Sequence, residues 1–345
     1  MKQYTVGVDI GGTKCAVLLG DSHAPQNSSD RLLLDKIEFP TQVEKGPDHA
    51  IHHICSAIDA IISRNKVNLR QVVAIGISSG GPLDPVNGII QNPPNLHGWD
   101  NIPIVQMMQQ RYEIDAYIEN DANACALAEW RFGAARGLRN VIFLTFGTGM
   151  GAGLILNGRL FRGSTNMAGE VGHIRMAEFG PAGFGKAGSF EGFCSGGGIA
   201  QIARAKVTEQ LQMGLKPKFC PSFAQLDGLT AKSVAEAAEQ DDALAKEIYE
   251  ICGYYLGKGL AIMIDMLNPD IIILGSIYAR SQALLWPAAE RSLRSEALAN
   301  PMGHCKIAPS MLGDQIGDIA ANTVAINGKE ERSRDAVCAG SRAFG

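Results

Sequence analysis

Closely spaced cysteine pairs, an excess of basic residues and long apolar runs are all missing from this chain of 345 residues. The eight cysteines are scattered without a Cys-x-x-Cys pair, which argues against a disulfide framework and a cysteine-rich metal site. The net charge is −4, so the basic excess typical of nucleic-acid binders is absent. No apolar run reaches the ~18 residues that span a bilayer, and the first residues lack the charged and apolar regions typical of a signal peptide, so we expect none. We therefore expect a cytoplasmic protein that binds neither membranes nor nucleic acids.

The chain does have enough apolar residues for a sizeable core, since 46% are hydrophobic, and its length favours two domains. Short apolar runs predict strands at 4–10, 15–19, 33–39, 72–77, 114–118, 141–146, 152–156 and 271–274. Helical spacing covers 49–62, 122–132, 199–212, 231–239, 243–266, 283–298 and 316–326. Strands alternating with helices predict an α/β fold. No structure is predicted after residue 327.

A glycine turn separates the first two predicted strands, in the sequence Asp9-Ile10-Gly11-Gly12-Thr13-Lys14. It is not a Walker A loop, because the spacing differs and a strand follows where a P-loop needs a helix. Glycine backbone amides, the Thr13 hydroxyl and the Lys14 ammonium can nevertheless bind phosphate. Asp9 at the strand end could hold a magnesium ion. An ordinary hairpin turn explains the same residues equally well.

A second glycine turn, Gly147-Thr148-Gly149-Met150-Gly151, separates the strands predicted at 141–146 and 152–156. The repeated arrangement of strand, glycine turn and strand suggests an internal duplication. A tight turn in a crowded sheet would also explain the glycines. The pair of turns favours phosphate binding more than either alone, because a triphosphate needs donors from more than one side.

Polar residues that suit a sugar lie at several places in the chain. Asp121, within Glu119-Asn120-Asp121-Ala122-Asn123, precedes a helix and could act as a general base, although N-capping alone explains such a residue. A sugar ring needs carboxylates, amides and imidazoles aimed at its hydroxyls, and single residues of this kind are more often merely satisfied polar groups. The candidate sugar ligands are Asn95, Asn120, Glu170, His173 and Glu191. Gly275, after a buried strand, permits close approach of a planar ligand such as adenine.

In combination, these segments resemble the ROK family of repressors, open reading frames and sugar kinases, within the sugar kinase, heat-shock and actin ATPase superfamily. The resemblance extends from residue 4 to about 327. The segments that carry it, in order, are DIGGTK, PPNLHGW, ENDANACALAE, FGTGMGAGLIL, GEVGH and NPDIIILG.

The resemblance implies two RNase H-like α/β domains of the actin and hexokinase type around a central cleft. It implies a first domain of residues 1–119, completed by a C-terminal helix at about 316–345, and a second of 120–315. It also implies ATP-dependent phosphorylation of a hexose hydroxyl with magnesium, in a dimer. By matching motifs, Asp121 is the catalytic base. Sugar contacts fall on Gly81, Asn95, Asn120, Glu170, His173 and Glu191. Nucleotide contacts fall on Asp9, Gly11, Gly12, Thr13, Lys14, Thr148, Gly149 and Gly275.

One departure from the family is large. ROK proteins commonly bind structural zinc through three cysteines that follow the GxGH histidine, here His173. In this sequence the cysteine positions are Ala182, Phe184 and Ser189, none of which can replace a cysteine ligand. We therefore expect no zinc site, and hypothesise that packing replaces the metal. The aromatic residues of that hypothesis are Phe179, Phe184, Phe190 and Phe193.

Three functions are consistent with these sequence features. The first is a glucokinase-type enzyme that makes a sugar 6-phosphate, with N-acetylmannosamine, fructose or allose as alternative substrates. The second is a sugar-sensing ROK regulator without its own DNA-binding domain, since Asp9 lies too near the start for a preceding helix-turn-helix. The third is a structural or chaperone ATPase of the superfamily. The presence of Asp121 favours the kinase over the regulator, and the GEVGH and Asn95 segments disfavour the ATPase.

Overall fold

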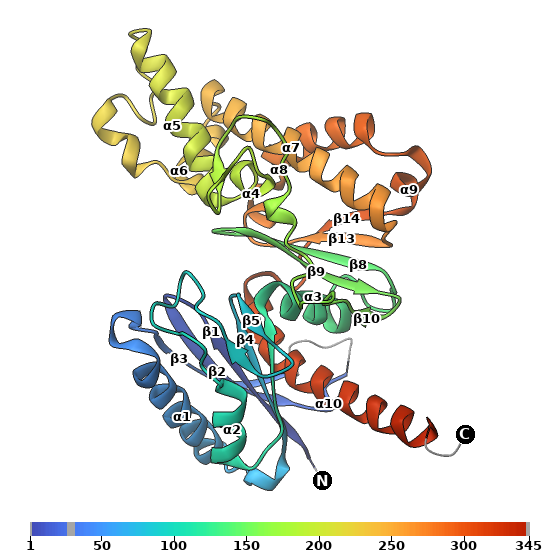
Figure 1. Ribbon diagram of the computed structural model, residues 1–345. Helices are drawn as coiled ribbons and strands as arrows, with labels where there is room; N and C mark the ends of the chain where they lie inside the picture. The colour runs from blue at the N-terminus through green and yellow to red at the C-terminus, as the bar shows by residue number, and fades with distance from the viewer. Residues whose placement is uncertain (1, 26–31, 343–345) are drawn as a thin grey trace. The chain divides into compact units, whose positions relative to one another are not determined.

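The computed structural model of the protein describes residues 2–25 and 32–342, with side chains to residue 334 (Figure 1). The chain forms two compact units. The first unit is Met1–Gly137 with Asp314–Gly345, and the second is Leu138–Gly313. The sequence prediction ended the first domain at residue 119. The structure instead keeps α3 (Asp121–Phe132) in the first unit, because α3 packs against the C-terminal helix α10 (Ile316–Arg342).

The first unit contains a five-stranded sheet in the order β3-β2-β1-β4-β7. The strands are β1 (Tyr4–Ile10), β2 (Lys14–Asp21), β3 (Leu33–Pro40), β4 (Val72–Ser79) and β7 (Ala116–Asn120). The first three form an antiparallel meander, and β4 and β7 run parallel to β1. This is the RNase H-like arrangement that the family resemblance predicts.

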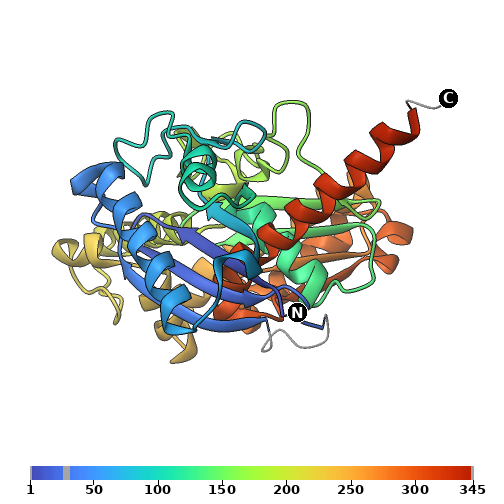
Figure 2. The same cartoon turned by 90° about the horizontal axis from the view of Figure 1, so that it is seen from below.

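Helices cover both faces of this sheet (Figure 1). Strand β2 alternates between the faces, as a strand buried on both sides must. Its residues Cys15 and Leu19 join the core under α1 (Gly46–Arg64) and α2 (Ile104–Tyr112), whereas Leu18 packs with Ala321 of α10. Figure 2 shows the end of α10 extending beyond the sheet.

The α10 helix lies unusually close to the sheet because small residues face it. A Cβ at Gly76 of β4 would come within 2.3 Å of the Ala321 carbonyl oxygen and the Ala325 nitrogen. Real Cβ atoms do not approach a backbone so closely, so only glycine fits at this crossing. The close approach places the N-terminus of α10 beside the end of β1. A Cβ at Gly317 of α10 would lie 3.5 Å from the Asp9 Oδ2.

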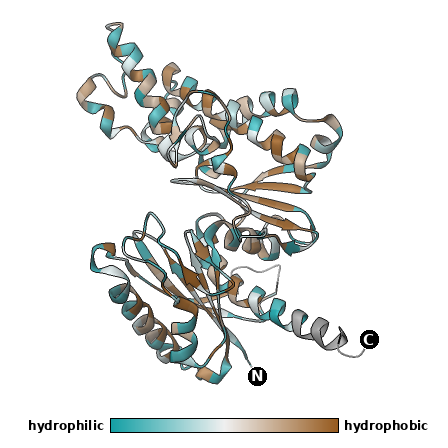
Figure 3. Ribbon diagram, viewed as in Figure 1, coloured by the Kyte–Doolittle hydropathy of each residue, from teal (hydrophilic) through white to brown (hydrophobic). Residues whose placement is uncertain are grey.

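The second unit repeats the same topology in a sheet ordered β10-β9-β8-β13-β14. The strands are β8 (Val141–Phe146), β9 (Met150–Leu156), β10 (Arg159–Leu160), β13 (Ile271–Leu274) and β14 (Lys306–Pro309). Again the first three in chain order are antiparallel, and the last two are parallel to β8. Figure 3 shows how strongly apolar β8, β9 and β13 are.

The second core lies between this sheet and a layer of helices. The helices are α4 (Phe190–Phe193), α5 (Gly196–Gln212), α6 (Ala231–Glu239), α7 (Ala243–Leu267), α8 (Ile277–Glu296) and α9 (Ala299–His304). Short strand pairs complete the structure: β5 (Leu83–Asp84) with β6 (Ile89–Ile90), and β11 (Ala182–Gly183) with β12 (Lys186–Ala187). Among the residues that the structure describes, no helix is both long enough and apolar enough to span a bilayer.

Candidate functional site

The first group of predicted site residues gathers at the carboxyl edge of the first sheet. Parallel pairing aligns Ile10 of β1 with Ser79 of β4, and Ser79 in turn with Asn120 of β7. Asp9, one residue before the end of β1, therefore lies on the same edge as Asn120 and Asp121. Ligands of open α/β sheets bind at such an edge, because strand ends and helix N-termini meet there.

The turn after β1 is closed by backbone and side-chain hydrogen bonds. The Gly11 amide donates to the Lys14 carbonyl at 3.0 Å, and the Thr41 hydroxyl donates to the Gly11 carbonyl at 2.5 Å. The side chains of Thr13 and Lys14 are exposed. Because the Lys14 ammonium forms an exposed ion pair with Glu38 at 2.9 Å, it can exchange that partner for a phosphate.

Asp9 is the most perturbed carboxyl group of this edge. Burial, followed by the negative charges of Asp121 and Asp318, raises its pKa to about 7. Asp318, in the first turn of α10, is itself paired with Lys36 at 2.9 Å. A buried carboxyl group with two carboxylates near it favours binding of a hard cation.

Magnesium fits this donor set in a specific way. Among residues 2–25 and 32–334, no three side chains of His, Cys, Asp or Glu lie close enough to hold a metal between them. Magnesium usually keeps several waters and binds through one or two carboxylates plus substrate phosphates. Asp9 is placed for that mode, which needs no cage made of protein alone.

The loop with Asn95 packs directly on the glycine turn. A Cβ at Gly12 would lie 2.6 Å from the Asn95 carbonyl oxygen, so glycine lets the two backbones touch. The loop is anchored by fully buried Trp99, whose carbonyl accepts from the Asn92 amide at 2.7 Å. The Cβ position of Gly81 lies 3.3 Å from the side-chain Nδ2 of Asn120. The first unit therefore brings together Gly81, Asn95 and Asn120.

A buried carboxylate fixes the junction between β7 and α3. Glu119 is only 2% exposed, and its Oε1 accepts from the Asn120 amide at 3.1 Å and from Asn123 Nδ2 at 2.9 Å. Asn120 caps α3 through the Ala122 amide at 2.9 Å. Asp121 is the first residue of α3 and is exposed. The sequence analysis gave Glu119 no role, although an acidic residue in an apolar strand was the available signal.

The second group surrounds the turn between β8 and β9 in the second unit. The Gly147 amide donates to the Gly149 carbonyl at 3.1 Å, and Thr148 is exposed at the tip. Behind the turn, Glu191 of α4 accepts from the Met150 amide through Oε2 at 3.0 Å. The structure thus connects the second glycine turn to a predicted sugar ligand.

Glu170 precedes the short helical turn Val171–His173 and His173 ends it, and both residues are exposed. Atoms around the Glu170 carboxyl group shield it in part, and this burial raises its pKa. The negative charge of Glu191 raises it further, and His173 opposes the shift. A Cβ at Gly172, between Glu170 and His173, would lie 3.2 Å from the Glu191 Cβ, so the turn that carries Glu170 and His173 packs on Glu191.

The region that carries zinc in many ROK proteins is a small hairpin, β11–β12. Of the three cysteine positions, Ala182 lies in β11 and Phe184 in the turn. Ser189 is buried and caps α4 by accepting from the Gly192 amide at 3.1 Å. The hypothesis of an aromatic cluster in place of zinc is wrong in part. Phe190 and Phe193 are buried, but Phe179 and Phe184 are exposed by 88% and 80%.

Two further details concern the predicted nucleotide contacts. A Cβ at Gly275 would come within 2.9 Å of the Phe143 ring, so core packing by itself explains this glycine. The sequence analysis missed the N-terminus of α5, which lies against the second glycine turn. Its Gly196 amide donates to the Gly147 carbonyl at 2.8 Å, and Ser195 caps the helix. The signal was the run Ser195-Gly196-Gly197-Gly198 before an apolar helix.

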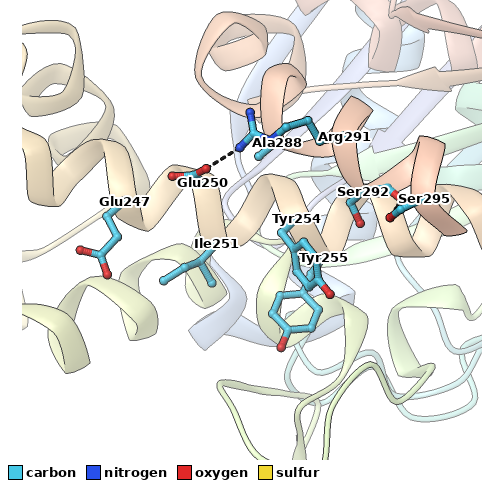
Figure 4. A pocket seen from close by; sticks show the side chains of 9 residues that line it. All are labelled: Glu247, Glu250, Ile251, Tyr254, Tyr255, Ala288, Arg291, Ser292 and Ser295. Atoms are coloured by element: carbon cyan, nitrogen blue, oxygen red, sulfur yellow. Dashed lines mark hydrogen bonds and ion pairs between the residues drawn. The ribbon is translucent and has the colours of Figure 1, made fainter.

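Two hollows lie away from these residues. One, of about 580 Å³, is formed by α7 and α8, with Tyr254, Tyr255 and the ion pair of Glu250 and Arg291 (Figure 4). The other, of about 850 Å³, lies in the first unit beside Arg70, Asp115 and Lys329. Neither contains a predicted site residue.

Comparison with known proteins identifies relatives over most of the chain. A model of the ROK family matches residues 5–327. The glucokinase of Halalkalibacterium halodurans is 31% identical over 92% of this chain and 93% of its own length. The DNA-binding transcriptional dual regulator NagC of Escherichia coli is 30% identical over 86% of this chain, but over only 68% of its own length.

A solved structure is similar as well. It is a ROK family glucokinase from Streptomyces griseus in complex with glucose and AMPPNP, and it is 29% identical to this chain. The match covers 93% of this chain and 99% of that protein, with a TM-score of 0.72.

Proposed function

This chain belongs to the ROK family, and from that premise we propose that it transfers a phosphoryl group from ATP to a hexose hydroxyl, with Asp121 as general base. It is an ATP-dependent sugar kinase. The finer proposal is a glucokinase-type reaction that yields a sugar 6-phosphate. Glucose is the first candidate, because a similar enzyme was solved with glucose and AMPPNP.

The exposed position of Asp121 carries this proposal. Its carboxylate stands at the N-terminus of α3, on the edge that also holds Asp9 and the first glycine turn. Phosphoryl transfer needs an acceptor hydroxyl that loses its proton as the bond to phosphorus forms. A carboxylate within reach of both the acceptor and the phosphate edge suits that role. Glu119 and Asn120 hold the backbone around it, so Asp121 needs little reorganisation.

We assign the phosphates of ATP to the two glycine turns. The first supplies backbone amides, Thr13 and Lys14, and the second supplies amides and the Thr148 hydroxyl. Asp9 would hold magnesium, which neutralises charge on the transferring phosphates when bound. Gly275 remains a candidate contact for the adenosine.

The sugar contacts are assigned by unit. Gly81, Asn95 and Asn120 of the first unit would hold the end of the ring near the phosphorylated hydroxyl. Glu170, His173 and Glu191 of the second unit would hold the anomeric end. A buried acceptor left unpaired costs about 1–3 kcal/mol, so these residues reject a sugar that lacks the matching hydroxyl.

ADP release, measured with a panel of hexoses and with ATP present or omitted, tests the function. A kinase releases ADP only when both substrates are present, whereas a superfamily ATPase releases it without sugar. A sugar-sensing regulator binds the sugar but releases no ADP. Location in the cytoplasm and assembly into a dimer stay predictions, which fractionation and sedimentation would check.

A further inference from the structure

The β11–β12 hairpin is held firmly against its surroundings in the second unit. Gln201 of α5 bonds Ala182 twice, accepting from its amide at 2.9 Å and donating to its carbonyl at 2.8 Å. A Cβ at Gly183 would lie 2.7 Å from the Glu191 Cβ, so the hairpin packs directly on α4. Lys186 Nζ donates to the His173 carbonyl at 2.7 Å. The tip of the hairpin is therefore fixed relative to Glu191 and His173.

The residue at that tip is costly in two ways. Phe184 and Gly185 form the two-residue turn, with φ values of +44° and +73°. A left-handed backbone suits glycine or asparagine, and a bulky side chain is a genuine outlier there. The Phe184 ring is also 80% exposed, so it gains almost nothing from burial. Strain at a single fixed position is a feature of ligand-binding sites.

The ring has one neighbour with a proposed function. Its centroid lies 6.4 Å from that of the His173 imidazole, with the two planes at 76°, which is an edge-to-face contact. The exposed face of Phe184 is thus next to the imidazole that we assign to the anomeric end of the sugar. The exposed Phe184 ring is therefore an apolar surface beside the proposed position of the anomeric end.

We propose that Phe184 is a specificity-determining residue, a platform for a carbon-containing substituent at carbon 1 or carbon 2 of the hexose. This inference rests on the proposed function, which places the anomeric end at Glu170 and His173. An acyl group or a second sugar ring has an apolar face, and burying that face against an aromatic ring is favourable. An unsubstituted hexose would not reach the ring, so Phe184 acts on the choice between substrates.

The test compares parent hexoses with their substituted forms. The probes are glucose and mannose, their N-acetylamino counterparts, and methyl and phenyl glucosides. Phe184→Asn removes the ring but keeps a residue that tolerates the turn. We expect the KM to rise about fivefold or more for the substituted sugars that contact the ring, which are the N-acetylamino sugars, the glucosides or both. Their kcat and the KM of the parent hexoses should change less than twofold. The N-acetyl and glucoside arms show which position carries the substituent.

Two matched variants keep the result specific. Phe184→Tyr retains an aromatic face and should restore the wild-type preference. Phe179→Asn removes the other exposed ring of this region and should leave every KM unchanged. An equal loss for parent and substituted sugars, no loss at all, or the same effect from Phe179→Asn would overturn the proposal. A change in oligomeric state without a change in sugar preference would overturn it as well.

Calorimetric titration of sugars without ATP separates this inference from the kinase assignment. If no hexose supports ADP release, the proposed function fails. Weaker binding of a substituted sugar to Phe184→Asn than to wild type would still support the platform. If neither the parent nor the substituted sugars bind to wild type, both proposals are wrong.

Discussion

The two glycine turns occupy equivalent places in two sheets of the same topology, yet their surroundings differ in charge. The turn between β1 and β2 lies among Asp9, Lys14 and Asp121, and buried Asp9 has a pKa raised to about 7. The turn between β8 and β9 carries no charged residue, and the Glu191 carboxylate behind it accepts a hydrogen bond from the Met150 amide. Equivalent backbones therefore support different chemistry.

We infer a division of labour from this difference. In the proposed mechanism the first unit would supply the base and the metal-binding carboxyl group, where charge develops during phosphoryl transfer. The second unit would supply donors to phosphate and the cluster proposed to distinguish sugars. Changes in the first unit should then act mainly on turnover, and changes in the second mainly on sugar KM.

The largest expected effect is that of Asp121→Asn. The amide keeps the shape of the side chain but cannot accept the hydroxyl proton, so kcat should fall roughly 100-fold or more. Sugar binding, measured by calorimetry, should change little. Asp59→Asn, at an exposed position on α1, is the matched control. Near-normal turnover in folded Asp121→Asn would show that the base lies elsewhere.

In the second unit, Glu170→Ala and Glu191→Ala should act on the sugar rather than on the chemical step. Loss of an acceptor for a sugar hydroxyl should raise the sugar KM about tenfold or more and blur the preference between epimers at carbon 1 or 2. The ATP KM should barely change. Steady-state kinetics with hexose epimers measures both. If the ranking of sugars is unchanged and ATP binding is lost, the cluster contacts ATP and not the sugar.

The glycines of the two turns give a direct comparison of packing. In Gly12→Ala the new Cβ would lie 2.6 Å from the Asn95 carbonyl oxygen, so the loop that carries Asn95 must move. In Gly147→Ala the nearest atom is the Ser276 hydroxyl at 3.8 Å, an ordinary contact. We expect Gly12→Ala to lower the melting temperature by several degrees, and Gly147→Ala to leave it unchanged or raise it slightly. Equal melting temperatures would contradict the close contact at Asn95.

The sequence predicted the parts of the fold that depend on local pattern. Apolar runs located β1, β4, β8 and β13 within two residues, and the glycine turns between strands were recognised. The edge strand β14 and the helix α2 were missed, because β14 is short and half-exposed and α2 has a weak apolar pattern. The helix predicted at 283–298 begins earlier, at Ile277, because a first helical segment precedes the non-helical backbone of Ser281 and is continuous with the segment that was predicted.

Contacts made at a distance were beyond the sequence. The hypothesis that aromatic packing replaces zinc needs Phe184 to be buried, but a left-handed turn exposes it. In the sequence Glu119 is an ordinary acidic residue. Its role follows only from the structure, where it accepts from the Asn120 backbone amide and the Asn123 side-chain amide. The domain boundary after residue 119 overlooked the packing of α3 on α10, which joins segments far apart in the chain.

The smallest expected effect concerns pH and the Glu170 carboxyl group. Burial and the charge of Glu191 raise its pKa, so it takes up a proton at a higher pH than an ordinary glutamate. Only the ionised form accepts hydrogen bonds from sugar hydroxyls through both oxygens. The sugar KM should therefore rise a few-fold as the pH falls through this raised pKa, and kcat/KM should report that pKa of the free enzyme.

Two variants identify the titrating group. Glu170→Gln should abolish this loss of sugar affinity at low pH, which we call the acid limb, because the amide does not titrate. Glu191→Gln should move the limb to lower pH, since it removes the like charge that helps to raise the pKa of Glu170. Asp121→Asn should leave the pH dependence of calorimetric sugar affinity intact if the two units act separately. An acid limb in sugar affinity that survives in Glu170→Gln and disappears in Asp121→Asn would assign the titration to the first unit and reverse the division of labour.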